Sequence, residues 1–411
     1  MPINNKRKFI NSNQNKGSAP PIDQINLLIH HYQTEKYSEA LKLAESITSK
    51  FPNHPFCFKI LNGIFSQINN YPSALTAIQK AVKLDSKDAE NYNLFAVTLK
   101  KMNRLEEAVS NYKKAITIKP NHAIFHYNLG NALKDMNKLL EAEESYRNAL
   151  VLKPELNNAL LNLGNTLQDL GNHDEAKLIY ERAIALNPNS HELHNSLGNT
   201  KRNLGLLDDA VISYLRAIEL QFDYADAHCN LGTTLRLLGR LEESEISLRK
   251  AIVFNTNFAE AFSQLGFTLQ ELKKIDEAIT LFKHSLILKP DHDQGHYNLA
   301  TLFFELGKFE EASHIYKKIH FEFSQSYYLY CLFLLDKKEL FNDQLCYLTE
   351  TKETNSIIGS LCDRAEIKYG GKNMNLFCNN PIDYCRHTSI INSCDFDNVF
   401  IRTANSILND N

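Results

Sequence analysis

The sequence lacks any strong excess of one charge. Its 45 Lys and Arg residues stand against 48 Asp and Glu residues, which leaves a net charge of −3 over 411 residues. A chain without a basic field has no long-range attraction for nucleic acid or for an anionic membrane, so we expect neither as a partner. No apolar run reaches the length of a membrane span, and residues 1–21 are polar, so we predict neither insertion nor export. We therefore expect a cytoplasmic protein.

Metal-binding motifs are incomplete. No Cys-x-x-Cys pair occurs, although six of the eight cysteines lie beyond position 330. A zinc site normally contains such a pair, because one loop can then fold around the ion. Four residues near the end of the chain stay open as an alternative set of ligands: Cys378, Cys385, His387 and Cys394. We expect reduced thiols instead, since disulfides are disfavoured in the cytoplasm, and we predict no bound metal.

Catalytic motifs are missing as well. A non-haem iron site needs two histidines and a carboxylate on one face of the metal. His320 and Glu322 form a His-x-Glu pair, but it lies in a helical pattern, and its partners would be the distant His387 and, as a 2-oxoglutarate anchor, Arg402. The glycines are spread along the chain rather than gathered in a phosphate-binding loop. We find no nucleophile, general base or cofactor motif, and predict a protein that is not an enzyme and holds no cofactor.

One spacing recurs along most of the chain. A column of small residues returns every 34 residues without insertion: Ala40, Ala74, Ala108, Ala142, Ala176, Ala210, Ser244, Ala278 and Ala312. Twelve residues before each lies a second small column, clearest at Ala96, Gly130, Gly164, Gly198, Gly232, Gly266 and Ala300. Aromatic residues keep a fixed phase against both, at Tyr112, Tyr146, Tyr180 and Tyr214. Small residues let two helices approach closely while rings fill the gaps, so the pattern predicts helix-turn-helix repeats.

Helix ends recur at the same spacing. Seven residues after the second small column stand Asn69, Asn103, Asn137, Gly171, Gly205, Gly239 and Gly307. Asn and Gly both tolerate the left-handed conformation that ends a helix, so each first helix is predicted to stop there, with Glu35 and Lys273 as exceptions to the residue type. Proline then closes the second helix of five repeats, at Pro52, Pro120, Pro154, Pro188 and Pro290.

These residues resemble the tetratricopeptide repeat, whose small-residue, Leu-Gly, aromatic and terminal-Pro pattern they match from about Asp23 to Ser324. The resemblance implies an all-α, right-handed superhelical solenoid of about nine repeats with a divergent helical cap. We expect a disordered arm at 1–21, the repeat array at 22–324, the cap at 325–371 and an irregular tail at 372–411. The cap is predicted to hold a tenth helical pair and one further helix from about Asn355 to Gly370.

The C-terminal region carries a second resemblance. Three stretches are involved: Ser356-Ile-Ile-Gly-Ser-Leu-Cys, Arg364-Ala-Glu-Ile-Lys-Tyr-Gly and Asn375-Leu-Phe-Cys-Asn-Asn-Pro-Ile-Asp-Tyr. They are similar to the segment that joins repeats to an iron- and 2-oxoglutarate-dependent oxygenase domain in some bacterial proteins of marine cyanobacterial type. The sequence stops at Asn411, about where that domain would begin. The resemblance implies a recruiting arm that is separate from its enzyme or has lost it.

The candidate site is a surface of the first helices. In tetratricopeptide-like arrays, the positions that flank the Leu-Gly pair face the concave side, and here they are mostly asparagine. We predict peptide binding by Asn128, Asn131, Lys134, Asn162, Asn165, Gln168, Asn199, Arg202, Asn230 and Arg236. An amide donates and accepts, so a ladder of amides can pair with a peptide backbone, and the cations favour a carboxylate. Asparagine is a poor helix former, so its recurrence favours binding over mere tolerance, although recent repeat duplication would produce the same recurrence.

The predicted function is that of a non-catalytic scaffold that binds an extended protein or peptide segment in an Asn-lined groove. The alternative is a substrate-recruiting arm of a separate or lost oxygenase or glycosyltransferase, the two enzyme classes to which similar Asn-rich arrays are joined. One histidine column is interpreted as helix packing: His126, His194, His228 and His296. The sequence leaves the identity of the partner and the oligomeric state open.

Overall fold

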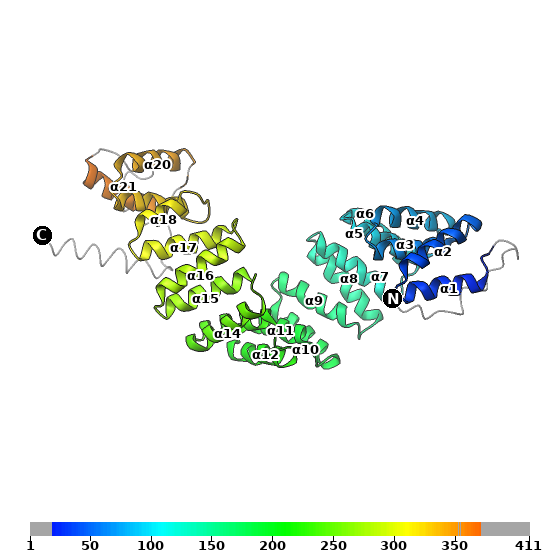
Figure 1. Cartoon of the computed structure of the whole chain (residues 1–411). Helices are drawn as coiled ribbons and strands as arrows, with labels where there is room; N and C mark the ends of the chain where they lie inside the picture. The colour runs from blue at the N-terminus through cyan, green and yellow to red at the C-terminus, as the bar shows by residue number, and fades with distance from the viewer. Residues whose placement is uncertain (1–18, 352, 354, 371–411) are drawn as a thin grey trace. The chain divides into compact units, whose positions relative to one another are not determined.

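The computed structural model describes residues 19–351, 353 and 355–370, which form helices with no strand among them (Figure 1). The predicted all-α class is therefore confirmed for this part of the chain. Contacts divide the chain into two compact units, Met1–Asn230 and Leu231–Asn411. The division falls inside α13 (Ala225–Leu237), between two residues of one helix.

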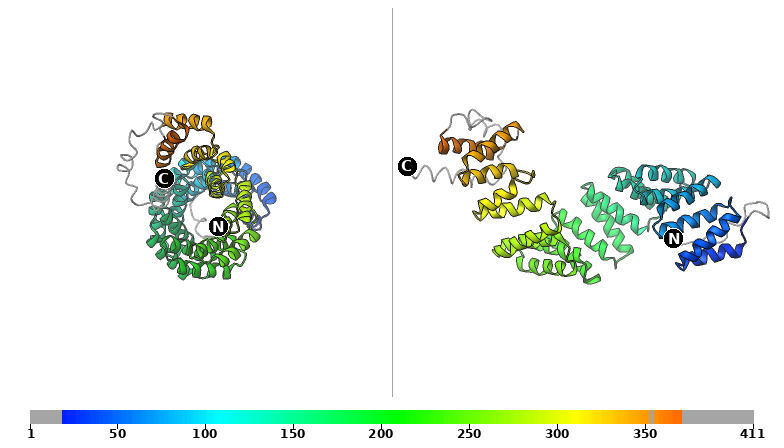
Figure 2. Two further views of the ribbon diagram at one scale, coloured as in Figure 1. Left: turned by 90° about the vertical axis from the view of Figure 1, so that its left-hand side faces the viewer. Right: turned by 45° about the horizontal axis from the view of Figure 1, so that its top comes forward.

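In the described part of the chain, nine helical pairs follow one another at the predicted spacing. The first helices are α1 (Ile22–Gln33), α3 (Pro55–Gln67), α5 (Ala89–Lys101), α7 (Ala123–Asp135), α9 (Asn157–Asp169), α11 (His191–Asn203), α13, α15 (Ala259–Glu271) and α17 (Asp293–Glu305). The second helices are α2 (Tyr37–Lys50), α4 (Tyr71–Leu84), α6 (Leu105–Ile118), α8 (Leu139–Leu152), α10 (His173–Leu186), α12 (Leu207–Leu220), α14 (Leu241–Phe254), α16 (Ile275–Leu288) and α18 (Phe309–Tyr316). Within the first unit, consecutive helices lie side by side in both views of Figure 2.

The turn inside each repeat has the predicted left-handed residue. Asn137 has φ 58° and Gly171 has φ 79°, and the other Asn and Gly residues of this column are also positive. Glu35 and Lys273 adopt the same conformation, with φ 59° and 63°. A side chain such as Glu or Lys costs about 1–2 kcal/mol there relative to the right-handed region. Packing of the two flanking helices therefore fixes this turn even where the residue type opposes it.

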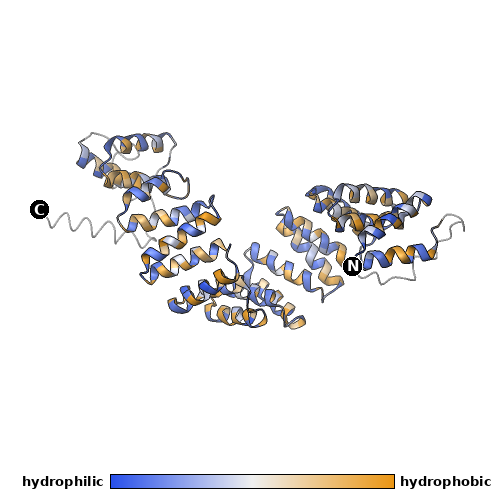
Figure 3. Cartoon of the chain, viewed as in Figure 1, coloured by the Kyte–Doolittle hydropathy of each residue, from blue (hydrophilic) through white to orange (hydrophobic). Residues whose placement is uncertain are grey.

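A buried tyrosine ring fills the space beside the glycine of the second small column. Tyr180 is fully buried on α10, and its ring covers the backbone of Gly164 on α9. A Cβ atom added to Gly164 would lie 2.6 Å from Cε1 of this ring, closer than two carbon atoms can pack. The pairs Gly130–Tyr146 and Gly198–Tyr214 repeat the arrangement. Figure 3 shows that the helices carry a hydrophobic face and a hydrophilic face.

Up to Gly370, where the described residues end, three further helices follow the repeats: α19 (Ser324–Leu334), α20 (Lys338–Glu350) and α21 (Ser356–Tyr369). Asn355 caps α21 by accepting a 3.1 Å hydrogen bond from the backbone N–H of Ile358, and Gly370 ends it with φ 66°. The predicted tenth helical pair and the helix after it are thus confirmed. Of the predicted arm at 1–21 only residues 19–21 are described, and the predicted tail at 372–411 lies outside the described residues.

We predict that Gly164→Ala lowers the free energy of unfolding by about 1–3 kcal/mol through overpacking. Alanine is the better helix former by about 1 kcal/mol, so helix propensity alone predicts the opposite sign. Gly359→Ala in α21 is the matched control, because an added Cβ there meets nothing within 4 Å, and this change should stabilise the chain. Urea denaturation of the two variants measures the difference. Equal stabilisation by both changes would contradict the packing of Tyr180 on Gly164.

Candidate functional site

The predicted site residues lie on four first helices, α7, α9, α11 and α13. Residues three apart in a helix share one face, so the positions on each helix form a single stripe. Nine of the ten residues belong to the first unit, and Arg236 belongs to the second. We call the asparagines of the first unit the amide row: Asn128, Asn131, Asn162, Asn165, Asn199 and Asn230.

Three asparagines of the amide row are held by buried tyrosines from the second helix of the same repeat. The hydroxyl of Tyr146 donates to Oδ1 of Asn131 at 2.8 Å. Tyr180 and Tyr214 donate in the same way to Asn165, at 2.5 Å, and Asn199, at 2.8 Å. Tyr180 also lies 3.0 Å from Oε1 of Gln168. Each of these three asparagines therefore uses its amide oxygen inside the protein.

The other asparagines of the row join neighbouring first helices. Asn128 donates from Nδ2 to Oδ1 of Asn93 on α5 at 2.9 Å, and Asn162 donates to Oδ1 of Asn131 at 2.7 Å. Asn230 donates to Oδ1 of Asn195 at 3.0 Å. Asn93 and Asn195 are buried, and neither belongs to the set predicted from the sequence. The signal that could have found them is asparagine recurring 35 residues before Asn128 and Asn230.

Internal bonding leaves a defined set of open groups on the amide row. Among the residues that the structure describes, Nδ2 of Asn131, Asn165 and Asn199 has no hydrogen-bond partner. Oδ1 of Asn128 and Asn162 likewise has none within the described chain. Because tyrosine hydroxyls and neighbouring amides fix which end of each amide points inward, the open ends are fixed as well. This differs from the expectation that each amide offers both its donor and its acceptor.

The cations of the predicted site are mostly neutralised by acids one repeat further along. Lys134 lies 3.1 Å from Asp169, and Arg236 lies 2.8 Å from Glu271. Lys100 forms the same contact with Asp135 at 2.9 Å. We call these contacts, each spanning 35 residues, inter-repeat ion pairs.

Two positions of the same column differ from this pattern. Gln168 donates from Nε2 to Oγ1 of Thr200 at 2.5 Å instead of forming an ion pair. Arg202 makes no ion pair with any residue that the structure describes, and Leu237 occupies the position where an acid would stand. Arg202 is thus the cation of the predicted set that pairs with no acid among the residues described.

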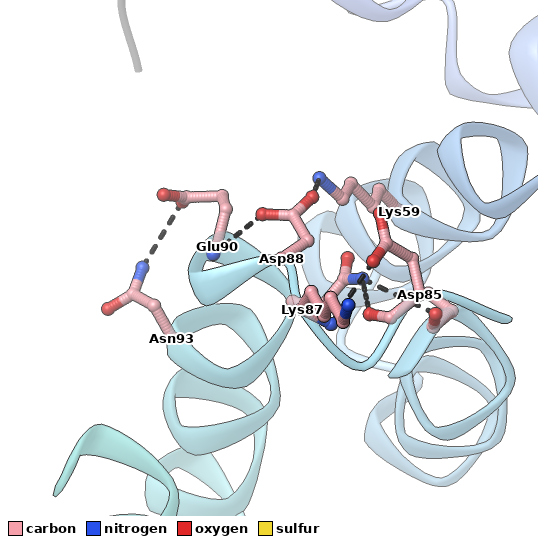
Figure 4. Close-up of polar contacts among 8 residues, drawn as sticks. Lys59, Asp85, Lys87, Asp88, Glu90 and Asn93 are labelled. Atoms are coloured by element: carbon pink, nitrogen blue, oxygen red, sulfur yellow. Dashed lines mark hydrogen bonds and ion pairs between the residues drawn. The ribbon is translucent and has the colours of Figure 1, made fainter. Parts of the chain in front are cut away.

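A polar cluster lies at the start of the amide row (Figure 4). Asn93 donates from Nδ2 to Oε1 of Glu90 at 3.2 Å, while Lys59 forms an ion pair with Asp88. The backbone N–H of Glu90 donates to Oδ1 of Asp88 at 2.9 Å, so Asp88 caps α5. Burial raises the pKa of the Glu90 carboxyl. Glu90 therefore holds the Nδ2 end of the Asn93 amide, and Oδ1 of the same amide accepts the hydrogen bond from Asn128.

The predicted packing histidines bind loop carbonyls. His126 lies with Nε2 2.9 Å from the carbonyl oxygen of Pro120, and His194 repeats this contact with Pro188 at 3.0 Å. His228 and His296 do the same toward residues six positions before them. A carbonyl only accepts, so Nε2 carries the proton in every case. The column therefore holds the turn between successive repeats.

Several predictions about metals fall outside the described residues. These are the possible ligands Cys378, Cys385, His387 and Cys394, together with Arg402. Among the residues that are described, no group of three or more His, Cys, Asp or Glu side chains converges as a metal site would require. No helix in the described part of the chain has the length and apolar content needed to cross a bilayer.

Comparison with protein families matches the repeats directly. Models of the tetratricopeptide repeat match residues 98–137, 123–156, 158–190, 179–212, 225–254 and 269–329. The chain is therefore a tetratricopeptide repeat protein, as the sequence predicts. Arrays of such repeats present extended surfaces that bind other proteins.

Solved structures of repeat proteins are similar to parts of the chain. One is YrrB, described as a TPR protein with an unusual peptide-binding site, with 25% identity and a TM-score of 0.38 over 48% of this chain and 97% of its own. MamA has 25% identity and a TM-score of 0.37 over 40% and 97%. The APC/C hetero-tetramer Cut9–Hcn1 has 19% identity and a TM-score of 0.48 over 69% and 56%. A comparison with curated proteins gives no match.

The buried tyrosines give the stability of the array a pH dependence. Burial raises the pKa of Tyr146 and of Tyr180 above the ordinary value of 10. A raised pKa means that the folded state favours the neutral phenol, so this stabilisation is present below pH 10 and is lost as the pH rises further. We predict that Tyr180→Phe reduces the fall in unfolding free energy above pH 10 by up to about 1.4 kcal/mol per pH unit. Urea denaturation between pH 9 and 11 measures the slopes, and identical slopes would contradict burial of the phenol.

Proposed function

We propose that the chain is a non-catalytic interaction scaffold that holds an extended peptide segment along the amide row of its first unit. The observation that carries the proposal is the fixed set of open groups: donors on Asn131, Asn165 and Asn199, and acceptors on Asn128 and Asn162. An extended peptide exposes one N–H donor and one C=O acceptor per residue. Side-chain amides that present both kinds of group match that backbone whatever its side chains are.

The chemistry of the row supports binding rather than catalysis. An amide neither titrates near neutral pH nor attacks a substrate, so a row of amides supplies no nucleophile and no general base. Asparagine also costs stability in the middle of a helix relative to alanine. The hydrogen bonds to Tyr146 and its equivalents occupy one end of each side-chain amide, and we expect a bound peptide to pair with the other end.

The charges beside the amide row favour a peptide that carries an acidic group. Lys134 already faces Asp169, so its charge adds little to a bound peptide. Arg202 has no internal acid among the described residues, so its guanidinium is the group we expect to meet an acidic side chain or a carboxylate of the peptide.

The partner is to be found with the full chain. Affinity capture from an extract of its native cell, followed by peptide arrays of each captured protein, identifies the bound segment. Calorimetry with the synthetic segment then gives the affinity on which variants are compared. If no array peptide binds the full chain, the proposed function is wrong.

We predict that the triple change Asn131→Asp, Asn165→Asp and Asn199→Asp weakens peptide binding by roughly 1.5–4.5 kcal/mol, about ten- to two-thousand-fold. Aspartate keeps the oxygen that accepts from Tyr146, Tyr180 and Tyr214, but it removes the three open N–H donors. The expected loss assumes one net hydrogen bond of about 0.5–1.5 kcal/mol at each position.

The matched control adds the same charge away from the row. Asn69, Asn103 and Asn137 all lie in turns with φ 58°, a conformation that aspartate also tolerates. Changing these three to Asp should leave the affinity unchanged within about two-fold, because exposed charges at a distance are largely screened. Equal losses in the two triple variants would assign the effect to charge and not to the open donors.

A second pair of variants separates the two cations. We predict that Arg202→Gln weakens binding of an acidic peptide by about two- to five-fold at low salt, since an exposed charge pair contributes about 0.2–1 kcal/mol. Lys134→Gln should change the affinity less, because Asp169 already pairs with this lysine. Titration at low and high salt measures both, and a larger effect for Lys134→Gln would contradict the assignment.

A further inference from the structure

A cavity of about 360 Å³ in the second unit is lined by residues of α15, of the turn after it and of α17. Figure 1 labels both helices. Its volume is at the lower end of the range for sites that take a small ligand or one long side chain. Phe267 and Tyr297 supply aromatic surface, and Glu271 and Glu305 supply carboxylates. These positions continue the columns of the amide row, but Phe267 stands where the first unit has Asn131, Asn165 and Asn199.

One side of the cavity shows how the protein itself places a cation there. The guanidinium of Arg236 lies 2.8 Å from Glu271 and 5.7 Å from the centre of the Phe267 ring. A cation over an aromatic face is attracted by the ring quadrupole, and the carboxylate adds a charge-assisted hydrogen bond. Arg236 therefore satisfies Glu271 from within the chain.

The corresponding cation is missing one repeat further along. Gln270 occupies the position that Arg236 holds in the preceding repeat, and it offers Glu305 a neutral amide N–H at 3.2 Å. Glu305 makes no ion pair with any residue described in the second unit. The inter-repeat ion pairs elsewhere each join an acid to a cation, so Glu305 is an acid of this series that lacks one, and it lines the cavity.

The one lysine that lines the cavity does not replace the missing cation. Lys273 is exposed in the turn after α15, and its ammonium forms no ion pair with Glu271 or Glu305. An exposed ammonium is hydrated and screened, so it reduces the negative potential of the cavity without forming a direct pair with Glu305.

We propose that this cavity, the Glu305 pocket, binds an arginine or lysine side chain of a bound peptide. The charged end would meet Glu305, and the aliphatic stem would lie against Phe267, Tyr297 and Leu302, a combination that suits a long amphipathic side chain. The inference rests on the proposed function, because it assumes that the chain binds a peptide. It adds a preference for a basic residue that the amide row does not supply.

The test uses the full chain and labelled octapeptides that are identical apart from one central residue. That residue is arginine, its neutral isostere citrulline, leucine or glutamate, and fluorescence anisotropy at low ionic strength gives the affinities. We expect arginine to bind about three- to ten-fold more tightly than citrulline, from one carboxylate contact and one cation–ring contact. Equal affinity for arginine and citrulline, or tighter binding of leucine, would overturn the proposal.

Three variants assign the effect to this pocket. Glu305→Gln should bring the arginine-to-citrulline ratio close to one. Gln270→Arg copies the arrangement of Arg236 and Glu271, so it should fill the pocket with an internal cation and also abolish the ratio. Lys273→Asn removes a like charge and keeps a residue that fits this turn, as Asn137 does with φ 58°, so it should raise the ratio about two-fold. A ratio that persists in Glu305→Gln and Gln270→Arg would place cation binding elsewhere and overturn the inference.

The proposed function and this inference fail in different ways. If the amide row does not bind peptides, the triple Asn→Asp variant keeps the affinity for the segment that the peptide arrays identify, while the arginine-to-citrulline ratio still reports on the pocket. If the pocket is wrong, the ratio is one in the native chain, while the triple variant still loses affinity for the segment that the peptide arrays identify.

Discussion

The first unit depends on one contact, that of a buried tyrosine on the second helix with a glycine and an asparagine on the first. The ring of Tyr180 packs on the backbone of Gly164, and its hydroxyl holds Asn165 from inside. Gly164 and Asn165 are adjacent in sequence, so the same tyrosine sets both how closely the helices approach and which end of the amide faces outward. Core packing and the geometry of the candidate binding surface are therefore a single property of this array.

The periodic features of the fold could be predicted from the sequence because each depends on a local preference. Columns of small residues mark close helix contacts, and Asn or Gly marks the left-handed turns. This local rule fails at Glu35 and Lys273, because both adopt the left-handed turn conformation against their own preference. Tertiary packing fixes the backbone conformation at these two positions, and the residue type gives no local indication of it.

The helix face that carries the candidate residues could be predicted from the sequence, but the hydrogen bonds of these residues could not. Helical spacing places Asn128 and Asn131 on one face, as expected. Which atoms remain open depends on partners 15 to 35 residues away, such as Tyr146 for Asn131 and Asn93 for Asn128. The same limit holds for charge. Lys134 and Arg202 look equivalent in the sequence, whereas Asp169 neutralises Lys134 and no described acid pairs with Arg202.

The constant register of these contacts bears on how such a surface changes during evolution. Lys100 pairs with Asp135, and Asp169 stands 34 residues after Asp135. Recombination that removed residues 123–156, one complete repeat, would bring Lys100 into register with Asp169 and Asn93 into register with Asn162. This junction keeps an acid for its cation and an acceptor for its amide. This part of the array can therefore shorten by one whole repeat in a single genetic event, so its length changes in steps of one repeat rather than through gradual substitution.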